Sequence, residues 1–216
     1  MKIAIYDMDR TLTRRASWTH WLFFFARTEA PARLLLAPLL LAPMLGFAIG
    51  LVDRKGLKEA TQRLMMGPRV PRATVERSAA RFAARFGAAN ELRGALASVA
   101  ADRAAGLEPV LATASCRYYG KALAARWGIE QIIATENVWD GDALTPRIRG
   151  ENCYEMGKLR MILASLSERP RHVKFVSDDV SDLAVLMWAD EPVAANPSGP
   201  LRRVAGWRGW PVFDWT

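Results

Sequence analysis

The chain has few of the residues that build disulfide frameworks or nitrogen- and sulfur-based metal sites, since its 216 residues include 2 Cys and 2 His. Cys116 and Cys153 cannot form a disulfide framework, which indicates a reducing, cytoplasmic setting. No base that would activate either thiol is identifiable, so both are interpreted as structural. His20 and His172 lack metal-ligand spacing. Any metal site is therefore expected to use oxygen ligands.

Acidic residues are fewer than basic ones, at 22 Asp and Glu against 30 Lys and Arg, for a formal net charge of +8. Residues 10–100 hold 15 basic and 5 acidic residues, so the surplus belongs to that stretch. A basic protein suits nucleic acid, an acidic membrane surface or a phosphorylated substrate. We expect no nucleic-acid partner, because the arginines are not interleaved with aromatic residues and no binding signature is present.

Short apolar runs that end in small or acidic residues alternate with helical segments, in a chain with 51% hydrophobic residues. We expect strands at residues 1–6, 109–115, 173–176 and 193–194, helices at 118–127 and 156–166, and a hairpin within 132–148. The hydrophobic content excludes disorder. The alternation predicts an α/β fold with a Rossmann-like, doubly wound parallel sheet.

Residues 13–90 interrupt this alternation with a long run of helix-forming residues. This stretch is predicted to be a helical cap inserted between the first and second strands of the core. The expected division is a catalytic core of residues 1–12 and 91–216 and a cap of residues 13–90.

The cap contains an uncharged apolar segment, Leu34 to Val52, about long enough to span a bilayer. Pro38 and Pro43 interrupt it, and a single span would separate the two ends of the chain, which argues against crossing. Three interpretations remain: a helical hairpin buried in the cap, a cap surface that enters a membrane interface, and a hydrophobic groove for an acyl chain or a partner.

Polar side chains follow the predicted core strands, where ligands bind in a parallel sheet. The residues at these ends are Asp7 and Asp9, Thr113 and Ser115, and Asp178 and Asp182. Carboxylates that meet at one crevice repel each other unless a cation holds them. Oxygen ligands without a histidine cluster favour Mg²⁺, which also binds substrate phosphate. Lys158 is expected beside that phosphate.

These residues occur in four ordered motifs that resemble those of the haloacid dehalogenase superfamily. The motifs are Asp7-Met8-Asp9-Arg10-Thr11-Leu12, Thr113, Lys158, and Ser177-Asp178-Asp179-Val180-Ser181-Asp182. The position of the insertion makes the chain most similar to the phosphoserine-phosphatase-like branch (subfamily IB). The apolar segment of the cap further resembles C-type phosphatidylglycerophosphate phosphatases.

The resemblance implies a role for each acidic motif residue. Asp7 would be the nucleophile that forms an aspartyl-phosphate, and Asp9 would protonate the leaving alcohol and then activate water. The Asp7 carboxylate, the Asp9 backbone carbonyl and Asp178 would hold Mg²⁺. Asp182 would support the metal through a water molecule or orient Lys158.

The same resemblance assigns phosphate binding to Thr113, to the backbone N–H of Ala114 and to Lys158. Arg10 stands where the family commonly has a small residue, often Gly, and is expected near the entrance, in contact with substrate or cap. Ala114-Ser115 replaces the Gly-Gly pair of phosphoserine phosphatases, so phosphoserine is not the expected substrate. Ser115 is interpreted as the cap of the following helix.

Together these features predict a Mg²⁺-dependent phosphomonoester hydrolase. Its expected partner is a phosphorylated small molecule or a lipid head group. A lipid-phosphate phosphatase at the membrane surface, with a phosphatidylglycerophosphate-like substrate, is one alternative, and a non-catalytic membrane-binding module is another. The expected location is the cytoplasm, with peripheral contact between the cap and the inner face of the membrane.

Overall fold

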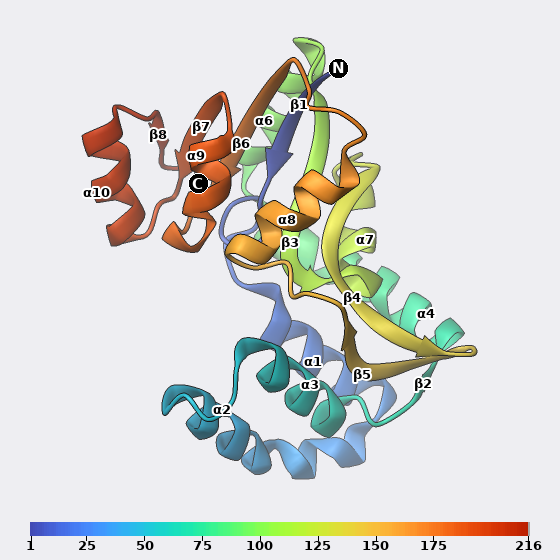
Figure 1. The fold of residues 1–216 in the computed structure, drawn as a ribbon. Coiled ribbons are helices and arrows are strands. Elements are labelled where there is room, and N and C mark those ends of the chain that lie inside the picture. Colours follow the sequence, from blue (N-terminus) through green and yellow to red (C-terminus); the bar gives the residue numbers. More distant parts are fainter. Residues whose placement is uncertain (216) are drawn as a thin grey trace.

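The computed structural model describes residues 1–215, and within them eight strands form one sheet in the order β2-β5-β4-β3-β1-β6-β7-β8 (Figure 1). The strands are β1 (Lys2–Tyr6), β2 (Val70–Pro71), β3 (Glu108–Cys116), β4 (Gln131–Asp140), β5 (Ala143–Arg149), β6 (His172–Ser177), β7 (Glu191–Ala195) and β8 (Val212–Phe213). Central β1 pairs in parallel with both β3 and β6. β5 and β2 extend the sheet beyond β4 with antiparallel pairs.

Helices cover both faces of the sheet, over two separate clusters of buried hydrophobic side chains. The core helices are α6 (Arg93–Ala104), α7 (Arg117–Arg126), α8 (Met156–Ser165), α9 (Leu183–Trp188), which follows the short 3-10 helix η3 (Val180–Asp182), and α10 (Gly199–Arg208). β1 contributes to both clusters, since Tyr6 packs with α6 and α7 and Ile5 with α8, α9 and α10. Alternate residues of a strand point to opposite faces, so an unbroken apolar run suits a doubly covered strand.

This architecture confirms the predicted fold class, with its parallel core and its insertion after the first core strand. The expected hairpin is formed by β4 and β5 around Asp140 to Ala143. The sequence pattern missed β2, β8, α6, α9 and α10. β2 and β8 have two residues each, too few to show a periodicity.

The insertion contains helices and one short strand. Its elements are α1 (Ser17–Glu29), the 3-10 helix η1 (Pro31–Leu40), α2 (Leu41–Ala48), α3 (Arg54–Met65), β2, α4 (Arg72–Phe82), the π-helix η2 (Ala83–Gly87) and α5 (Ala88–Asn90). β2 pairs with β5, so the cap is joined to an edge of the core sheet. At its base, the N–H of Arg14 donates to the carbonyl of Asn90 at 2.7 Å. The division at residues 12 and 91 stays a prediction.

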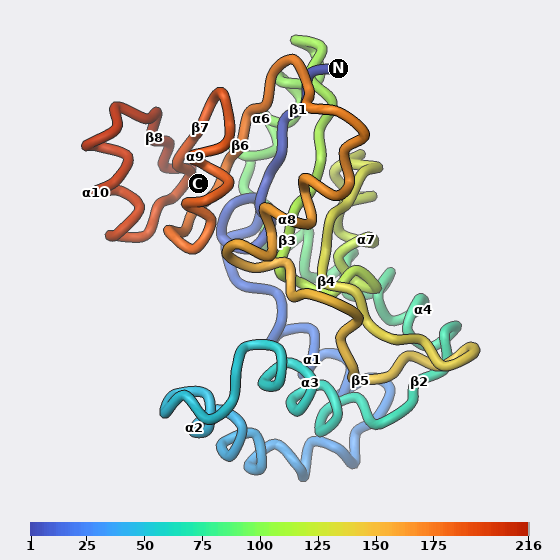
Figure 2. The backbone as a smooth tube through the Cα atoms, viewed as in Figure 1, coloured from blue at the N-terminus to red at the C-terminus, as the bar shows by residue number. Residues whose placement is uncertain are grey.

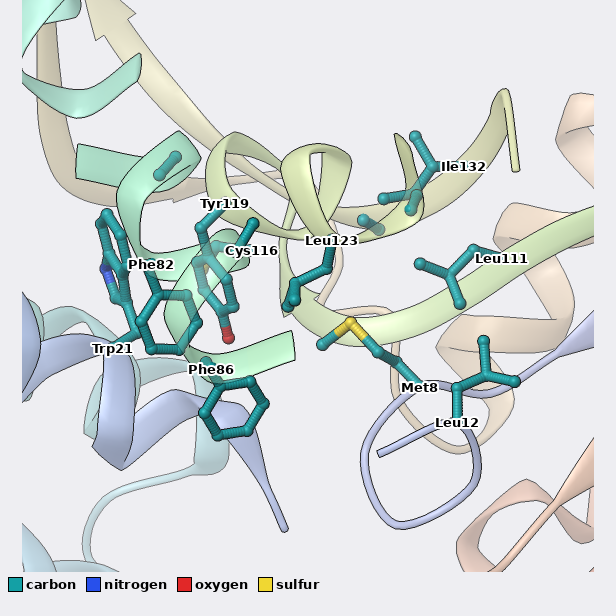
Figure 3. Close-up of a cluster of buried hydrophobic side chains, with 14 of the residues drawn as sticks. Met8, Leu12, Trp21, Phe82, Phe86, Leu111, Cys116, Tyr119, Leu123 and Ile132 are labelled. Atoms are coloured by element: carbon teal, nitrogen blue, oxygen red, sulfur yellow. The ribbon is translucent and has the colours of Figure 1, made fainter. Parts of the chain in front are cut away.

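Aromatic side chains tie the cap to the core (Figure 3). The ring of Trp21, on cap helix α1, lies parallel to that of Tyr119, on core helix α7, with 5.1 Å between centroids. Phe82, on α4, meets both rings edge to face. Such aromatic pairs stabilise a fold by about 0.5–1.5 kcal/mol, in addition to the free energy gained from the hydrophobic area that they bury. α1 and α4 are therefore anchored on α7, on the side of the cap remote from α2.

The apolar segment of the cap lies at its outer edge, where Figures 1 and 2 show η1 and α2 away from the core sheet. Pro31–Ala48 is long and apolar enough to cross a membrane, with a mean hydropathy of 1.6, yet none of it is buried. The interpretation of Leu34 to Val52 as a buried hairpin was therefore wrong. Hydrophobicity alone does not reveal which apolar segments are buried against the rest of the protein.

Candidate active site

All eight residues expected at the site line a single cavity of about 360 Å³ at the carboxyl ends of the core strands. They are Asp7, Asp9, Arg10, Thr113, Ala114, Lys158, Asp178 and Asp182. Asp7 directly follows β1 and Asp178 directly follows β6, while Thr113 lies near the end of β3. Because these strands are parallel and adjacent, their last residues reach the same edge of the sheet. The roles assigned to these residues remain predictions.

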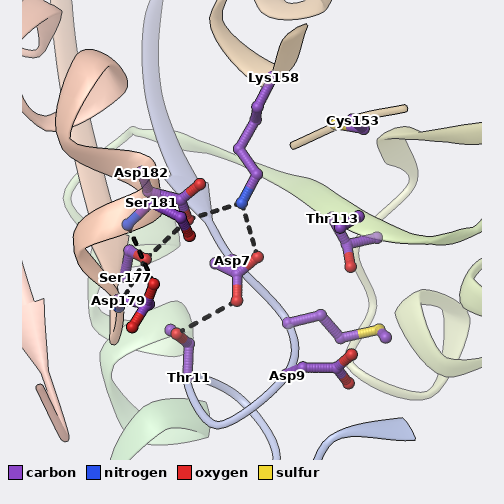
Figure 4. A network of polar contacts seen from close by, with 12 residues as sticks. Asp7, Asp9, Thr11, Thr113, Cys153, Lys158, Ser177, Asp179, Ser181 and Asp182 are labelled. Atoms are coloured by element: carbon purple, nitrogen blue, oxygen red, sulfur yellow. Dashed lines mark hydrogen bonds and ion pairs between the residues drawn. The ribbon is translucent and has the colours of Figure 1, made fainter. Parts of the chain in front are cut away.

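Lys158 forms a buried ion pair with two of the carboxylates (Figure 4). Its Nζ lies 2.8 Å from Asp7 Oδ1 and 2.6 Å from Asp182 Oδ2. Burial alone would lower the pKa of Lys158, but the charges of Asp182 and Asp7 outweigh it and raise that pKa above its ordinary value. The hydroxyl of Ser177 also donates to Asp182 Oδ2, at 2.7 Å. Asp182 thus contacts Lys158 directly, while both roles expected for it remain predictions.

Asp7 and Asp178 approach each other around the hydroxyl of Thr11. Thr11 Oγ1 lies 3.5 Å from Asp7 Oδ2 and 3.4 Å from Asp178 Oδ1. Burial raises the pKa of Asp7 to about 7, against the opposing charge of Lys158. Burial, together with the charge of Asp7, raises the pKa of Asp178 to about 8. The single lysine therefore does not compensate all the negative charge of this cluster.

The donor set fits a magnesium ion. Asp7 and Asp178 supply carboxylate oxygens from adjacent strands, and the second oxygen of Asp182, Oδ1, is buried with no hydrogen-bond partner. Within residues 1–215, no three His, Cys, Asp or Glu side chains form a metal-binding group by themselves. Two carboxylates, a backbone carbonyl and water are nevertheless a normal ligand set for Mg²⁺, and the raised pKa values mark charge that a cation would neutralise.

The Asp9 carboxylate is turned away from Asp7 and toward the base of the cap (Figure 4). Its Oδ1 accepts from the N–H of Ser17 at 2.9 Å, and its Oδ2 accepts from the Ser115 hydroxyl at 3.0 Å. Burial raises the pKa of Asp9, although these two hydrogen bonds oppose the shift. A carboxyl group with a raised pKa suits a general acid.

Ser115 does not cap a helix, contrary to the sequence-based interpretation. The N-cap position of α7 is Cys116, which makes no side-chain capping bond. Instead, the Ser115 hydroxyl reaches Asp9 and also lies 3.0 Å from the Ser17 hydroxyl. Capping preferences describe local contacts only, whereas Asp9 and Ser17 are about a hundred residues away along the chain.

Arg10 lines the cavity, as expected, and has a left-handed backbone with φ of 65°. Glycine adopts this conformation without steric cost, which explains why a small residue is common there in the family. The Arg10 side chain is exposed. It therefore places a solvent-exposed positive charge at the cavity that holds the carboxylates.

The phosphate-binding segment is supported by residues that the sequence did not reveal. Thr113 Oγ1 accepts from the N–H of Ser115 at 3.0 Å, which leaves its own hydroxyl proton available to a ligand. The carbonyl of Ala114 accepts from Thr135 Oγ1 at 2.8 Å and also from the ammonium group of cap residue Lys58. Lys58 belongs to no recognisable sequence motif. Its contact with the Ala114 segment joins residues that are far apart in the chain, so only the tertiary structure shows it.

Arg54 and Tyr154 form a wall between the active-site cavity and an outer cavity of about 620 Å³. The Arg54 guanidinium lies 3.9 Å from the centre of the Tyr154 ring and donates to its hydroxyl at 3.2 Å. Arg54 begins cap helix α3, and Tyr154 lies in the loop before α8. If the phosphate of a substrate lay at the carboxylate cluster, its organic part would contact Arg54 and Tyr154.

Known proteins resemble this chain in sequence and in fold. The profile of the haloacid dehalogenase-like hydrolases matches residues 4–187. A protein of unknown function from Bordetella pertussis Tohama I superposes with a TM-score of 0.86 at 26% identity, over 99% of this chain and 98% of that one. A substrate-bound phosphoserine phosphatase superposes with a TM-score of 0.62 at 14% identity, over 98% and 92%. The latter likeness shows the fold alone.

A parallel sheet with an inserted cap and a carboxylate cluster at its strand ends defines a hydrolase core. The chain belongs to the haloacid dehalogenase-like hydrolase family. A histidinol-phosphatase from Neisseria meningitidis serogroup C (strain 8013) is 33% identical over 95 residues, which are 41% of this chain and 43% of that protein. The match therefore spans less than half of that relative. The predicted resemblance to this superfamily is confirmed. The chain shares the fold of a phosphoserine phosphatase, as its expected likeness to that branch requires.

Proposed function

We propose that this protein is a phosphatase that hydrolyses phosphomonoesters through an aspartyl-phosphate on Asp7. The observation that carries the proposal is the position of the Asp7 carboxylate, which lines the cavity while Lys158 binds its Oδ1 at 2.8 Å. Lys158 holds Oδ1 at 2.8 Å, whereas Oδ2 has only a long contact of 3.5 Å with the Thr11 hydroxyl, so Oδ2 is the oxygen that would attack phosphorus. The new P–O bond forms as the bond from phosphorus to the substrate alcohol breaks.

Asp9 acts as general acid in the first half-reaction and as general base in the second. In its protonated form it donates to the leaving alcohol, and its carboxylate then takes a proton from the water that attacks the aspartyl-phosphate. In the structure, hydrogen bonds from Ser17 and Ser115 hold this carboxyl group turned away from Asp7, so it would rotate toward the leaving group for these transfers. The products are inorganic phosphate, the alcohol and the regenerated Asp7.

Phosphoryl oxygens are bound by the Thr113 hydroxyl, by the N–H of Ala114 and by Lys158, whose charge offsets theirs. Asp7, Asp178 and the backbone carbonyl of Asp9 are the residues that would hold Mg²⁺. When bound, the ion supplies further neutralisation of the phosphate and of the carboxylates around it.

The proposed substrate is a phosphorylated small molecule whose organic part passes Arg54 and Tyr154. A lipid head-group phosphate is the second candidate, favoured by the exposed apolar segment that brings Phe47 to the outer cavity. A phosphatidylglycerophosphate-like substrate stays a prediction. The cytoplasm is the proposed location, supported by the unpaired, buried thiols of Cys116 and Cys153.

The test compares the wild-type protein with Asp7→Asn on an aryl phosphate in the presence of Mg²⁺. We expect turnover to fall by at least about a thousandfold, because the nucleophile is lost. Acid-quenched wild-type protein should carry a phosphoryl group that Asp7→Asn lacks. The control Asp142→Asn, in the exposed β4–β5 turn, should keep full activity. Full activity in Asp7→Asn would refute the mechanism, and no turnover by the wild-type protein on any phosphomonoester would favour the binding module.

A further inference from the structure

Residues 31–51, here called the apolar edge, expose many large apolar side chains at the outer edge of the cap. Its exposed large side chains are Leu35, Leu39, Leu41, Met44, Leu45, Phe47, Ile49 and Leu51. Leu35 is 83% exposed and Leu51 is 80% exposed. Single exposed hydrophobic residues are normal, but a group of this size is typical of a surface that binds a membrane or another protein.

The charges around the apolar edge favour a negatively charged partner. The segment between Glu29 and Asp53 contains no acidic residue. Those two carboxylates are already engaged, Glu29 with Arg77 at 3.0 Å and Asp53 with the N–H of Gly56 at 2.7 Å. The cap, residues 13–90, holds 13 Lys and Arg against 4 Asp and Glu. Nothing on this edge would therefore repel an anionic surface.

Basic residues flank the apolar edge on both sides along the chain. Arg27 lies in the last turn of α1 just before it, and Arg54 and Lys55 begin α3 just after it. Arginine and lysine beside an apolar helical face are typical of segments that lie in the head-group region of a bilayer.

The geometry allows insertion into the interface but not a crossing. α1 and α3, at the two ends of the apolar edge, contact each other within one cap. The chain must therefore go out and return within residues 31–51, and η1 and α2 contain 10 and 8 residues. At about 1.5–2 Å per residue, neither helix spans the roughly 30 Å hydrocarbon core. Side chains on such helices reach about 5–10 Å into the interface.

We propose that residues 31–51 dock the protein onto the surface of an anionic lipid bilayer. Docking goes beyond the proposed catalytic function and requires no turnover, so Asp7→Asn should bind the bilayer as the wild-type protein does. The docked edge would bring the outer cavity close to the membrane, because Phe47 of this edge lines that cavity together with Arg54.

A cysteine-labelling experiment tests which part of the surface enters the bilayer. Both native cysteines are buried, so a cysteine introduced as Leu41→Cys can be labelled selectively with an environment-sensitive dye. The matched control is Trp207→Cys on α10, where the tryptophan is 86% exposed and lies outside the apolar edge. We expect a blue shift of the Leu41→Cys label with vesicles of phosphatidylcholine and phosphatidylglycerol, and none for the control. Equal behaviour of the two labels would overturn the proposal.

Cosedimentation with the same vesicles tests the two sources of affinity. Leu35→Glu combined with Leu45→Glu should weaken binding by more than about tenfold, since burial of one leucine alone contributes about that factor. Circular dichroism and hydrolysis of a soluble aryl phosphate should stay unchanged, because these side chains are exposed and remote from the carboxylates. Binding should also weaken with salt and on pure phosphatidylcholine. Equal binding to both vesicle types would refute an anionic partner.

A second copy of the chain is the competing occupant of the apolar edge. In that case the Leu41→Cys label would shift with protein concentration in the absence of lipid, and sedimentation velocity would show a dimer that Leu35→Glu with Leu45→Glu dissociates. That result, without lipid binding, would overturn the proposal.

Discussion

The ammonium group of Lys58, on cap helix α3, lies 2.7 Å from the side-chain oxygen of Asn152, in the loop between β5 and α8. The same group donates to the carbonyl of Ala114, whose N–H is proposed to bind phosphate. Burial lowers the pKa of Lys58. One cap residue thus holds two loops of the active site.

Replacement of Lys58 by Met should reduce turnover of an aryl phosphate by about tenfold, because the Ala114 segment loses a charged donor. The free energy of unfolding should change by less than about 1–2 kcal/mol, since removing a buried charge also removes its desolvation cost. Steady-state kinetics and urea unfolding measure the two effects. Lys55→Met is the matched control, because Lys55 belongs to the same helix and donates to the Gly150 carbonyl at 3.0 Å. Equal effects of the two substitutions would contradict this role.

Asp182→Asn should lower both activity and stability. Lys158 would keep Asp7 as its only carboxylate partner, and loss of one charge from a buried, hydrogen-bonded pair costs about 1–3 kcal/mol. Asp7 would also become a poorer nucleophile as Lys158 moves toward it. Chemical unfolding and aryl-phosphate kinetics measure the change. Asp214→Asn, at an exposed ion pair with Arg202, should leave both values nearly unaltered.

Stability without metal should fall as pH rises from about 4 to about 8. The folded protein holds protons on Asp7 and Asp178, with pKa values of about 7 and about 8, whereas in the unfolded chain these groups lose them near the ordinary value of 3.8. The unfolded state therefore binds fewer protons across this window, and deprotonation favours unfolding.

Mg²⁺ should reverse this loss, because the ion replaces the protons on the two carboxylates. The rise in Tm on adding Mg²⁺ should be larger near pH 8 than near pH 5, and EDTA should abolish it. Asp178→Asn should reduce both the pH dependence and the effect of Mg²⁺. A Mg²⁺ effect of the same size at both pH values would contradict the assignment of these ligands.

Asp9→Asn should separate the two half-reactions. An aryl phosphate has a good leaving group and needs little acid assistance, so Asp7 should still be phosphorylated. Hydrolysis of the aspartyl-phosphate should slow by about a hundredfold or more, because no base activates water. The expected result is a burst of one equivalent of phenolate and an accumulated phosphoenzyme, measured by rapid quench and intact mass. A normal steady state without a burst would argue against the role of Asp9.

Two substitutions at Arg10 should separate the effect of its side-chain charge from the effect of its left-handed backbone conformation. Arg10→Ala removes the charge but keeps a side chain at a φ of 65°, whereas Arg10→Gly removes both. We expect KM for soluble phosphates to rise several-fold in each. Arg10→Gly should be the more stable of the two by about 1 kcal/mol, because glycine avoids the left-handed penalty. Thermal unfolding and initial rates give these values, and equal stability would mean that the conformation is not strained.

The sequence was sufficient for the core sheet and for the residues that gather at its edge. A short apolar run that ends in Asp7 or Asp178 predicts a buried parallel strand with a polar end, and adjacent parallel strands deliver those ends to one place. Lys158 needed the family resemblance, since an isolated lysine near the start of a helix is ordinarily solvated.

The long-range contacts around this edge could not be predicted from the sequence. Lys58 meets Ala114, Ser115 meets Asp9, and Arg54 meets Tyr154 across separations of 56, 106 and 100 residues. The same limit explains why a buried hairpin was one of three interpretations of residues 34–52, of which none is buried. Periodicity reports which face of an element is apolar, but only the packing of distant elements decides whether another part of the protein covers that face.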